Sequence, residues 1–71
     1  MVSACILIRT VHGEFCKVVD RIKNIDGVVR VFPVLGRYDV VVDFQASDNA
    51  TLGRSVYKIS RMAGVVFTET L

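Results

Sequence analysis

The order of the apolar segments is the feature that most constrains the fold of this chain. Runs rich in Val, Ile, Leu and Phe alternate with two segments in which apolar residues recur every three or four positions. Strands are predicted over 3–10, 28–35, 38–44 and 65–71, and helices over 14–25 and 49–61. This βαββαβ order is typical of the α+β ferredoxin-like fold, in which one four-stranded antiparallel sheet carries both helices on one face.

Turn and cap residues support these boundaries. Asp26-Gly27 and Gly64 end the two helices, Asp48 offers an N-cap for the second, and Gly36-Arg37 is predicted to turn a hairpin. Pro33 cannot donate to a strand ladder, so its strand is predicted at a sheet edge or distorted near its middle. The apolar faces predicted for the two helices are Phe15, Val18, Val19, Ile22 and Ile25, and Leu52, Val56, Ile59 and Met62.

The strands are apolar on both sides, which a one-sided sheet does not require. In the first strand Cys5 and Leu7 lie opposite Ile6 and Ile8, and in the third Val41 stands between two carboxylates. The second strand is predicted to place Val29, Val31 and Leu35 on one face and Phe32 and Val34 on the opposite face. A chain of 71 residues that is 52% hydrophobic needs further support, because ordering costs roughly 1.5 kcal/mol per residue. We therefore predict an obligate homodimer joined sheet to sheet, in a dimeric α/β-barrel-like association.

Charge and segment lengths exclude several classes of protein. Nine Lys and Arg residues against seven Asp and Glu residues give a net charge of +2, without the basic block expected of a nucleic-acid-binding protein. The apolar start, Met1 to Ile8, is much shorter than the roughly 18 residues of a membrane span. With no secretory signal and only Cys5 and Cys16, a cytoplasmic location without a disulfide framework is expected.

Two motifs resemble a known family. The hairpin contains Gly36-Arg37-Tyr38-Asp39 followed by an apolar strand, and the chain closes with Gly64-Val65 and then Thr68-Glu69-Thr70. This pattern is similar to the Gly-x-Tyr-Asp turn, the Pro-Gly-Val turn and the final Thr-x-Thr strand of the Lrp/AsnC effector-binding domain, also called the RAM domain. The resemblance covers residues 1–71. Leu35 and Ala63 depart from it, since the family often has Thr and Pro there.

The resemblance implies a non-enzymatic, ligand-sensing domain of the transcription-regulator type. Dimers of this family assemble into octamers or related rings, and amino acids or similar metabolites bind at the seams between dimers. These 71 residues do not include the DNA-binding helix-turn-helix of full-length members, so the chain is expected to resemble the stand-alone form. Its expected partners are further copies of itself, a small-metabolite effector and a full-length Lrp/AsnC regulator, without direct DNA binding.

The candidate ligand residues are chosen for the chemistry of an amino-acid zwitterion, which needs an anion for its ammonium group and donors for its carboxylate. Asp39 offers the anion, and the N–H groups around Gly36 and the guanidinium of Arg37 offer donors. The remaining candidates are Tyr38, Thr68 and Thr70. The alternative is structural: a turn glycine, an aromatic strand residue and β-forming threonines.

Other functions are weaker on the residues. His12 and Cys16 share a spacing of four, but two ligands do not make a zinc site, and no cofactor is expected. With a single His, no pair of base and nucleophile can be argued for an enzyme. An RNA-binding module of the same topology would place Asp39 and Asp43 near phosphates. A pure assembly module without a ligand remains the other alternative.

Overall fold

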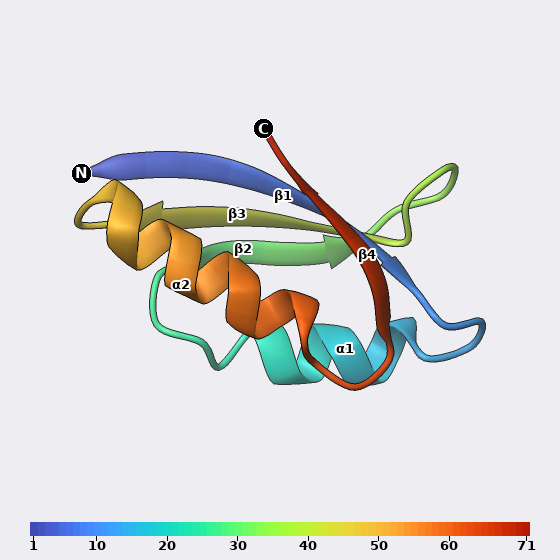
Figure 1. Cartoon of the computed structure of the whole chain (residues 1–71). Helices are drawn as coiled ribbons and strands as arrows, with labels where there is room; N and C mark the ends of the chain where they lie inside the picture. The colour runs from blue at the N-terminus through green and yellow to red at the C-terminus, as the bar shows by residue number, and fades with distance from the viewer.

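The chain folds as one antiparallel sheet with both helices on the same face (Figure 1). The computed structural model describes all 71 residues. In chain order the elements are β1 (Val2–Thr10), α1 (Phe15–Ile22), β2 (Val28–Pro33), β3 (Val40–Ala46), α2 (Asn49–Ser60) and β4 (Val65–Thr70). The strand order β2-β3-β1-β4 confirms the predicted ferredoxin-like fold. The sheet of one chain is open and not closed into a barrel; the barrel-like association of two copies stays a prediction.

The core lies between the helices and the two central strands. β1 and β3 pair along most of their length, and every second residue of each points toward the helices. The buried hydrophobic side chains are Ile6, Ile8, Val18, Ile22, Val40, Val42, Phe44, Ala46 and Ile59. These nine are the whole buried hydrophobic core, although half the residues of the chain are hydrophobic, so much apolar surface is left outside it.

The cap of α2 is as predicted, whereas Gly27 does not end the first helix but lies in the turn before β2. Asp48 caps α2, since its carboxylate accepts a hydrogen bond from the N–H of Thr51 at 2.7 Å, and this bond lowers the pKa of Asp48. Gly27 lies in the turn that leads into β2 and has a φ of +99°. A Cβ atom there would lie 2.6 Å from the ring of Phe44 and 2.7 Å from the carbonyl oxygen of Gln45. Only glycine fits this turn.

The prediction for the second strand was partly wrong. Pro33 does lie on an edge strand, as expected. However, the register shifts between Val28 and Arg30, and this bulge breaks the simple alternation. Val28 and Val31 pack against the core, whereas Val29 is exposed. Val29 and Val31 therefore do not share a face.

The predicted boundaries were also too long at three places. α1 ends at Ile22, and Ile25 packs against the core from the turn that follows. β2 ends at Pro33 and β3 begins at Val40, so the hairpin loop is longer than Gly36-Arg37. Leu35 lies fully exposed in this loop rather than in a strand. Phe15, in the first turn of α1, is also exposed, contrary to the predicted apolar face. Neither helix is long and apolar enough to span a membrane.

Candidate functional site

The sheet has a second face that no element of the chain covers. The strand register places Leu7 of β1 beside Val41 of β3, and Val41 beside Phe32 of β2. These three side chains alternate with the buried ones, so they point away from the helices. We call this surface the open face. Its centre is an apolar row that crosses three neighbouring strands.

Polar groups border this row on one side. Arg30 and Asp43 sit in the next row of the open face and form an ion pair, with Nη2 and Oδ2 2.6 Å apart. Cys5 is opposite Asp43 in the register. Both partners of the ion pair keep solvent contact, so it contributes little to stability by itself. The open face is therefore an apolar centre with a polar margin, which is the usual composition of a protein interface.

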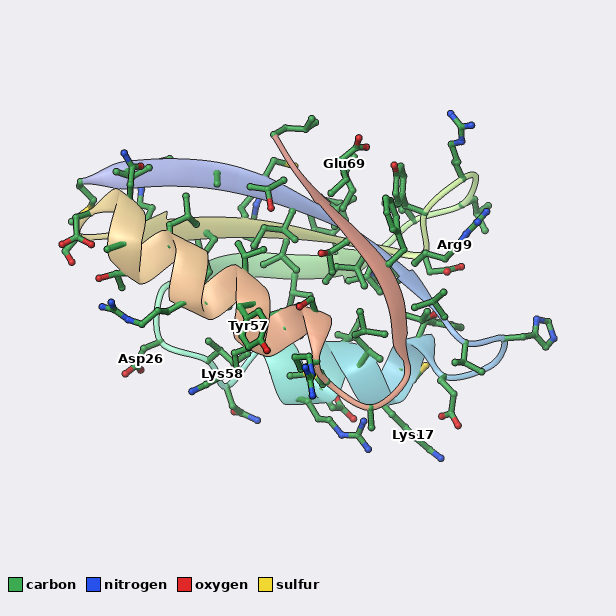
Figure 2. The ribbon with its side chains drawn as sticks, in the orientation of Figure 1. Arg9, Lys17, Asp26, Tyr57, Lys58 and Glu69 are labelled. Atoms are coloured by element: carbon green, nitrogen blue, oxygen red, sulfur yellow. The ribbon has the colours of Figure 1, made fainter.

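A hollow with both signs of charge lies at the other end of the open face. Arg9, Arg37, Tyr38, Phe67 and Glu69 line a space of about 450 Å³. We call these five residues the margin cluster. Arg37 and Tyr38 come from the loop between β2 and β3, whereas the others come from β1 and β4. Glu69 points away from both helices in Figure 2.

Tyr38 joins the loop to the last strand. Its hydroxyl donates a hydrogen bond to Oε2 of Glu69 at 2.5 Å. This bond raises the pKa of Tyr38, partial burial and the negative charge of Glu69 raise it further, and the charges of Arg37 and Arg9 act in the opposite direction. Tyr38 consequently remains a protonated donor at neutral pH. The loop is thereby held against β4.

Asp39 has a structural task in this chain. Its Oδ2 accepts the backbone N–H of Thr10 at 2.8 Å, and its own backbone N–H donates to the carbonyl of Ile8 at 2.9 Å. The second carboxylate oxygen has no partner among the hydrogen bonds of the chain. Gly36 is exposed at the tip of the same loop, with a φ of +122° and open space where a side chain would be.

The predicted site residues are not all brought together in one chain. Arg37 and Tyr38 meet in the margin cluster, and Gly36 and Asp39 flank them in the loop. Thr68 and Thr70 pair with Ile8 and Ile6, so they point to the helix side of β4. One chain therefore does not present the threonines and the loop to the same small ligand. A role in ligand binding for any of the six residues stays a prediction.

Reasoning from the sequence did not single out three members of the margin cluster, namely Arg9, Phe67 and Glu69. The sequence contained features that could have marked two of them as site residues, because Arg9 is the only charged residue in its strand and Glu69 lies between the two threonines. Placing them together requires the pairing of β1 with β4, in which Arg9 faces Phe67 and Leu7 faces Glu69. That register is not encoded in either strand alone.

The remaining sequence candidates are dispersed. His12 and Cys16 are both exposed at the start of α1, and no three His, Cys, Asp or Glu side chains gather where they could hold a metal ion. Asp43, which would repel a nucleic-acid phosphate, is paired with Arg30 on the open face.

Known structures share this architecture over the whole chain. The protein TTHA0845 from Thermus thermophilus is 32% identical and superposes with a TM-score of 0.95, covering 100% of this chain and 90% of that chain. FFRP-DM1 is 28% identical with a TM-score of 0.96, over 100% of this chain and 96% of that chain. AsnC of E. coli, at 18% identity and a TM-score of 0.88, shares the fold over 97% of this chain and 48% of its own length.

A comparison with curated proteins finds no match to the chain. A comparison with protein families agrees with the structural similarity. The family profile described as the Lrp/AsnC ligand binding domain matches residues 3–71, which include both motifs on which the resemblance was based. The chain therefore belongs to the Lrp/AsnC ligand-binding domain family.

Proposed function

We propose that this chain is a ligand-sensing and oligomerisation domain of the Lrp/AsnC transcription-regulator type. In this proposal it forms a homodimer through the open face, binds an amino acid or a related small metabolite at a seam between dimers, and modulates full-length regulators. The observation that carries the proposal is the apolar row of Leu7, Val41 and Phe32, which lies uncovered beside a hollow that contains both guanidinium and carboxylate groups.

Burial of apolar surface supports the dimer. The open face also carries the exposed ring of Phe67, which lies beside Arg9, and the covered face holds only nine buried hydrophobic side chains. Burial contributes about 25 cal/mol per Å² of apolar surface removed from water, so a second sheet packed on this face would stabilise the chain further. A two-fold dimer would also duplicate the polar margin on both sides of the interface.

The chemistry of the margin cluster supports a zwitterionic ligand. The guanidinium groups of Arg9 and Arg37 suit a carboxylate, since each can donate two parallel hydrogen bonds. The carboxylate of Glu69 suits an ammonium group, and the second carboxylate oxygen of Asp39, in the adjoining loop outside the cluster, could add to it. Glu69 already accepts from Tyr38, so a ligand would compete with or share that bond.

The threonines require a second chain in this proposal. Thr68 and Thr70 point to the helix side of β4, away from the margin cluster of their own chain. At a seam between dimers they would contribute from a neighbouring subunit. Ligand binding and assembly are then coupled, because a ligand that contacts two dimers stabilises only the assembled state.

Light scattering after size exclusion tests the assembly, with and without each of the common amino acids. We expect a dimer at micromolar concentration and a larger assembly in the presence of the effector. A monomer mass that no amino acid changes would contradict both parts of the proposal.

Isothermal calorimetry tests the site itself. Asp39→Asn removes the charge of the side chain, but its amide oxygen can still accept the N–H of Thr10, so the loop is expected to stay in place. We expect this variant to bind the effector at least about tenfold more weakly, the loss typical of a charge-assisted hydrogen bond. Asp20→Asn on α1 is the matched control and should bind like the wild type.

An assembly module without a ligand is the second candidate. It is favoured by the hydrogen bonds that occupy Asp39 and Glu69 within the chain. A stable dimer or ring that binds none of the amino acids in calorimetry would select it.

A further inference from the structure

Helix α2 and its C-cap residue carry three positive side chains on the outer face, without a carboxylate among them. Arg54, Lys58 and Arg61 follow at spacings of four and three, so they lie on one side of the helix. None of them forms an ion pair. We call these three residues the basic stripe. It faces away from the sheet and thus away from the open face.

The other helix shows that this arrangement is not a general property of the chain. On α1 and its ends both lysines are neutralised, Lys17 by Glu14 at 3.3 Å and Lys23 by Asp20 at 3.2 Å. Like charges that follow at three or four residues destabilise a helix by a few tenths of a kcal/mol per pair. No ion pair within the chain offsets this repulsion along the basic stripe.

The same face of α2 has two further features that the stability of the helix does not explain, a glycine at Gly53 and an exposed aromatic ring at Tyr57. Gly53 stands inside α2, where glycine is the worst helix former after proline. A Cβ atom there would meet nothing within 4 Å, so packing within the chain does not require glycine. Tyr57, one turn later, is 63% exposed. Gly53 and Tyr57 line one shallow hollow together with the basic stripe, and Tyr57 and Lys58 are marked on α2 in Figure 2.

We infer that this surface binds an acidic segment of a partner protein. Carboxylates of the segment would pair with Arg54, Lys58 and Arg61. The absence of a side chain at Gly53 would allow the backbone of the segment to approach the helix. The guanidinium of Arg61 is 5.7 Å from the centre of the Tyr57 ring and donates to its hydroxyl at 3.1 Å, so the ring is held in place. The hydroxyl hydrogen of Tyr57 is then free to donate to a carboxylate.

A second copy of this chain does not fit the surface. Its acidic side chains are already engaged: Glu14, Asp20 and Asp43 in ion pairs, Asp39 and Glu69 in hydrogen bonds, and Asp48 as a helix cap. Only Asp26 has no partner within the chain, and nowhere do three carboxylates gather in one place to match the three cations. The partner is therefore a different chain.

A continuous nucleic-acid strand fits less well than an acidic segment. Asp26 lines a small hollow beside Lys58, and Asp48 lies at the N-terminal end of α2. Carboxylates thus stand next to the basic stripe, where they would repel the further phosphates of a strand, whose charges repeat at every nucleotide. A short segment with a few carboxylates can contact the three cations without extending to Asp26 or Asp48.

Fluorescence anisotropy with a labelled peptide tests this inference on the full chain. The probe repeats Glu-Glu-Leu, and the matched peptide repeats Gln-Gln-Leu. We expect the acidic probe to bind and the neutral one not to bind. Arg54→Gln with Lys58→Gln should weaken binding at least about tenfold, as expected when charge-assisted contacts are removed. Lys17→Gln with Lys23→Gln changes the net charge equally and should leave the affinity within about twofold.

Gly53→Gln separates binding from folding. A glutamine is a better helix former than glycine, so the melting temperature should rise by roughly 2–5 °C, while the added side chain fills the hollow and weakens binding of the probe several-fold. The inference is wrong if the acidic probe does not bind, if both double variants lose affinity equally, or if Gly53→Gln binds like the wild type. Tighter binding of single-stranded oligo(dT) than of the acidic probe would overturn it in favour of a nucleic-acid surface.

Discussion

The two faces of the sheet have similar strands but different surroundings. Toward the helices, Ile6, Val42 and their neighbours are completely buried, whereas on the other side Leu7 and Val41 are only partly covered by their own strands. The sequence makes both faces apolar, but it supplies helices for only one. The difference teaches that part of the apolar excess of the chain lies together on the open face, whereas other exposed apolar residues, such as Phe15 and Leu35, lie on a helix and in a loop.

Two phenylalanines on opposite faces provide the largest expected contrast. Phe44 is 2% exposed on the covered face, and Phe67 is 53% exposed on the open face. We expect Phe44→Ala to lower the free energy of unfolding by about 3–5 kcal/mol, since it leaves a cavity in a small core. Phe67→Ala should cost less than about 1 kcal/mol within one chain. Urea denaturation followed by circular dichroism compares them, and equal losses would contradict the division into two faces.

A charge in the centre of the open face should act on association rather than on the fold. Leu7→Lys places an ammonium group in the apolar row between Val41 and β4. We expect the dimer dissociation constant to rise at least about a hundredfold, or about 2.8 kcal/mol. Val11→Lys, at an exposed turn residue, is the control and should leave the dimer intact. Analytical ultracentrifugation measures both, and a folded wild-type monomer at micromolar concentration would refute the prediction.

Alanine substitutions at two turn glycines distinguish the cost of a packing clash on the covered face from the cost of backbone strain. Gly27 and Gly36 both have a positive φ, but only Gly27 is in contact with Phe44. An alanine at either site is strained, by about 1 kcal/mol. Gly27→Ala should therefore lose about 1–2 kcal/mol more stability than Gly36→Ala, because its Cβ must displace the Phe44 ring or the Gln45 backbone. Thermal unfolding gives both values; identical losses would mean that the contact with Phe44 relaxes freely.

The smallest effect is expected at the margin of the open face. Glu69→Gln removes the negative charge that accepts from Tyr38, so the pKa of Tyr38 should fall toward its ordinary value of 10.0. Because folding raises this pKa, the stabilisation is present below pH 10 and is lost as the pH rises through the higher pKa of the folded chain. Absorbance titration in a Tyr57→Phe background follows Tyr38 alone. An unchanged titration would show that the bond to Glu69 does not control it.

Much of the fold could be predicted because local chemistry and the overall topology agree. The helix-like spacing of Val18 and Ile22, the cap at Asp48 and the edge position of Pro33 all appear in the structure. The errors occurred where pairing between strands decides the outcome. Val29 left the predicted face because β2 bulges against β3, and no pattern within 28–35 marks that shift.

The site was predicted less completely than the fold. The loop residues Arg37 and Tyr38 were found because they form a continuous motif. Arg9 and Glu69 were missed, since they come from opposite ends of the chain and meet only through strand register. Thr68 and Thr70, which share the final motif with Glu69, point to the other side of β4 because side chains alternate along a strand.

The sequence by itself determined the order of the elements, the N-cap of α2 at Asp48 and the excess of apolar residues, because these depend on local propensity and periodicity. Only the tertiary structure decided which apolar residues stay uncovered and which charges meet. Strand pairing joins residues that are distant in the chain, and a shift of one residue moves a side chain to the other face. For that reason the open face, the margin cluster and the basic stripe became defined surfaces only once the sheet and its two helices were in place.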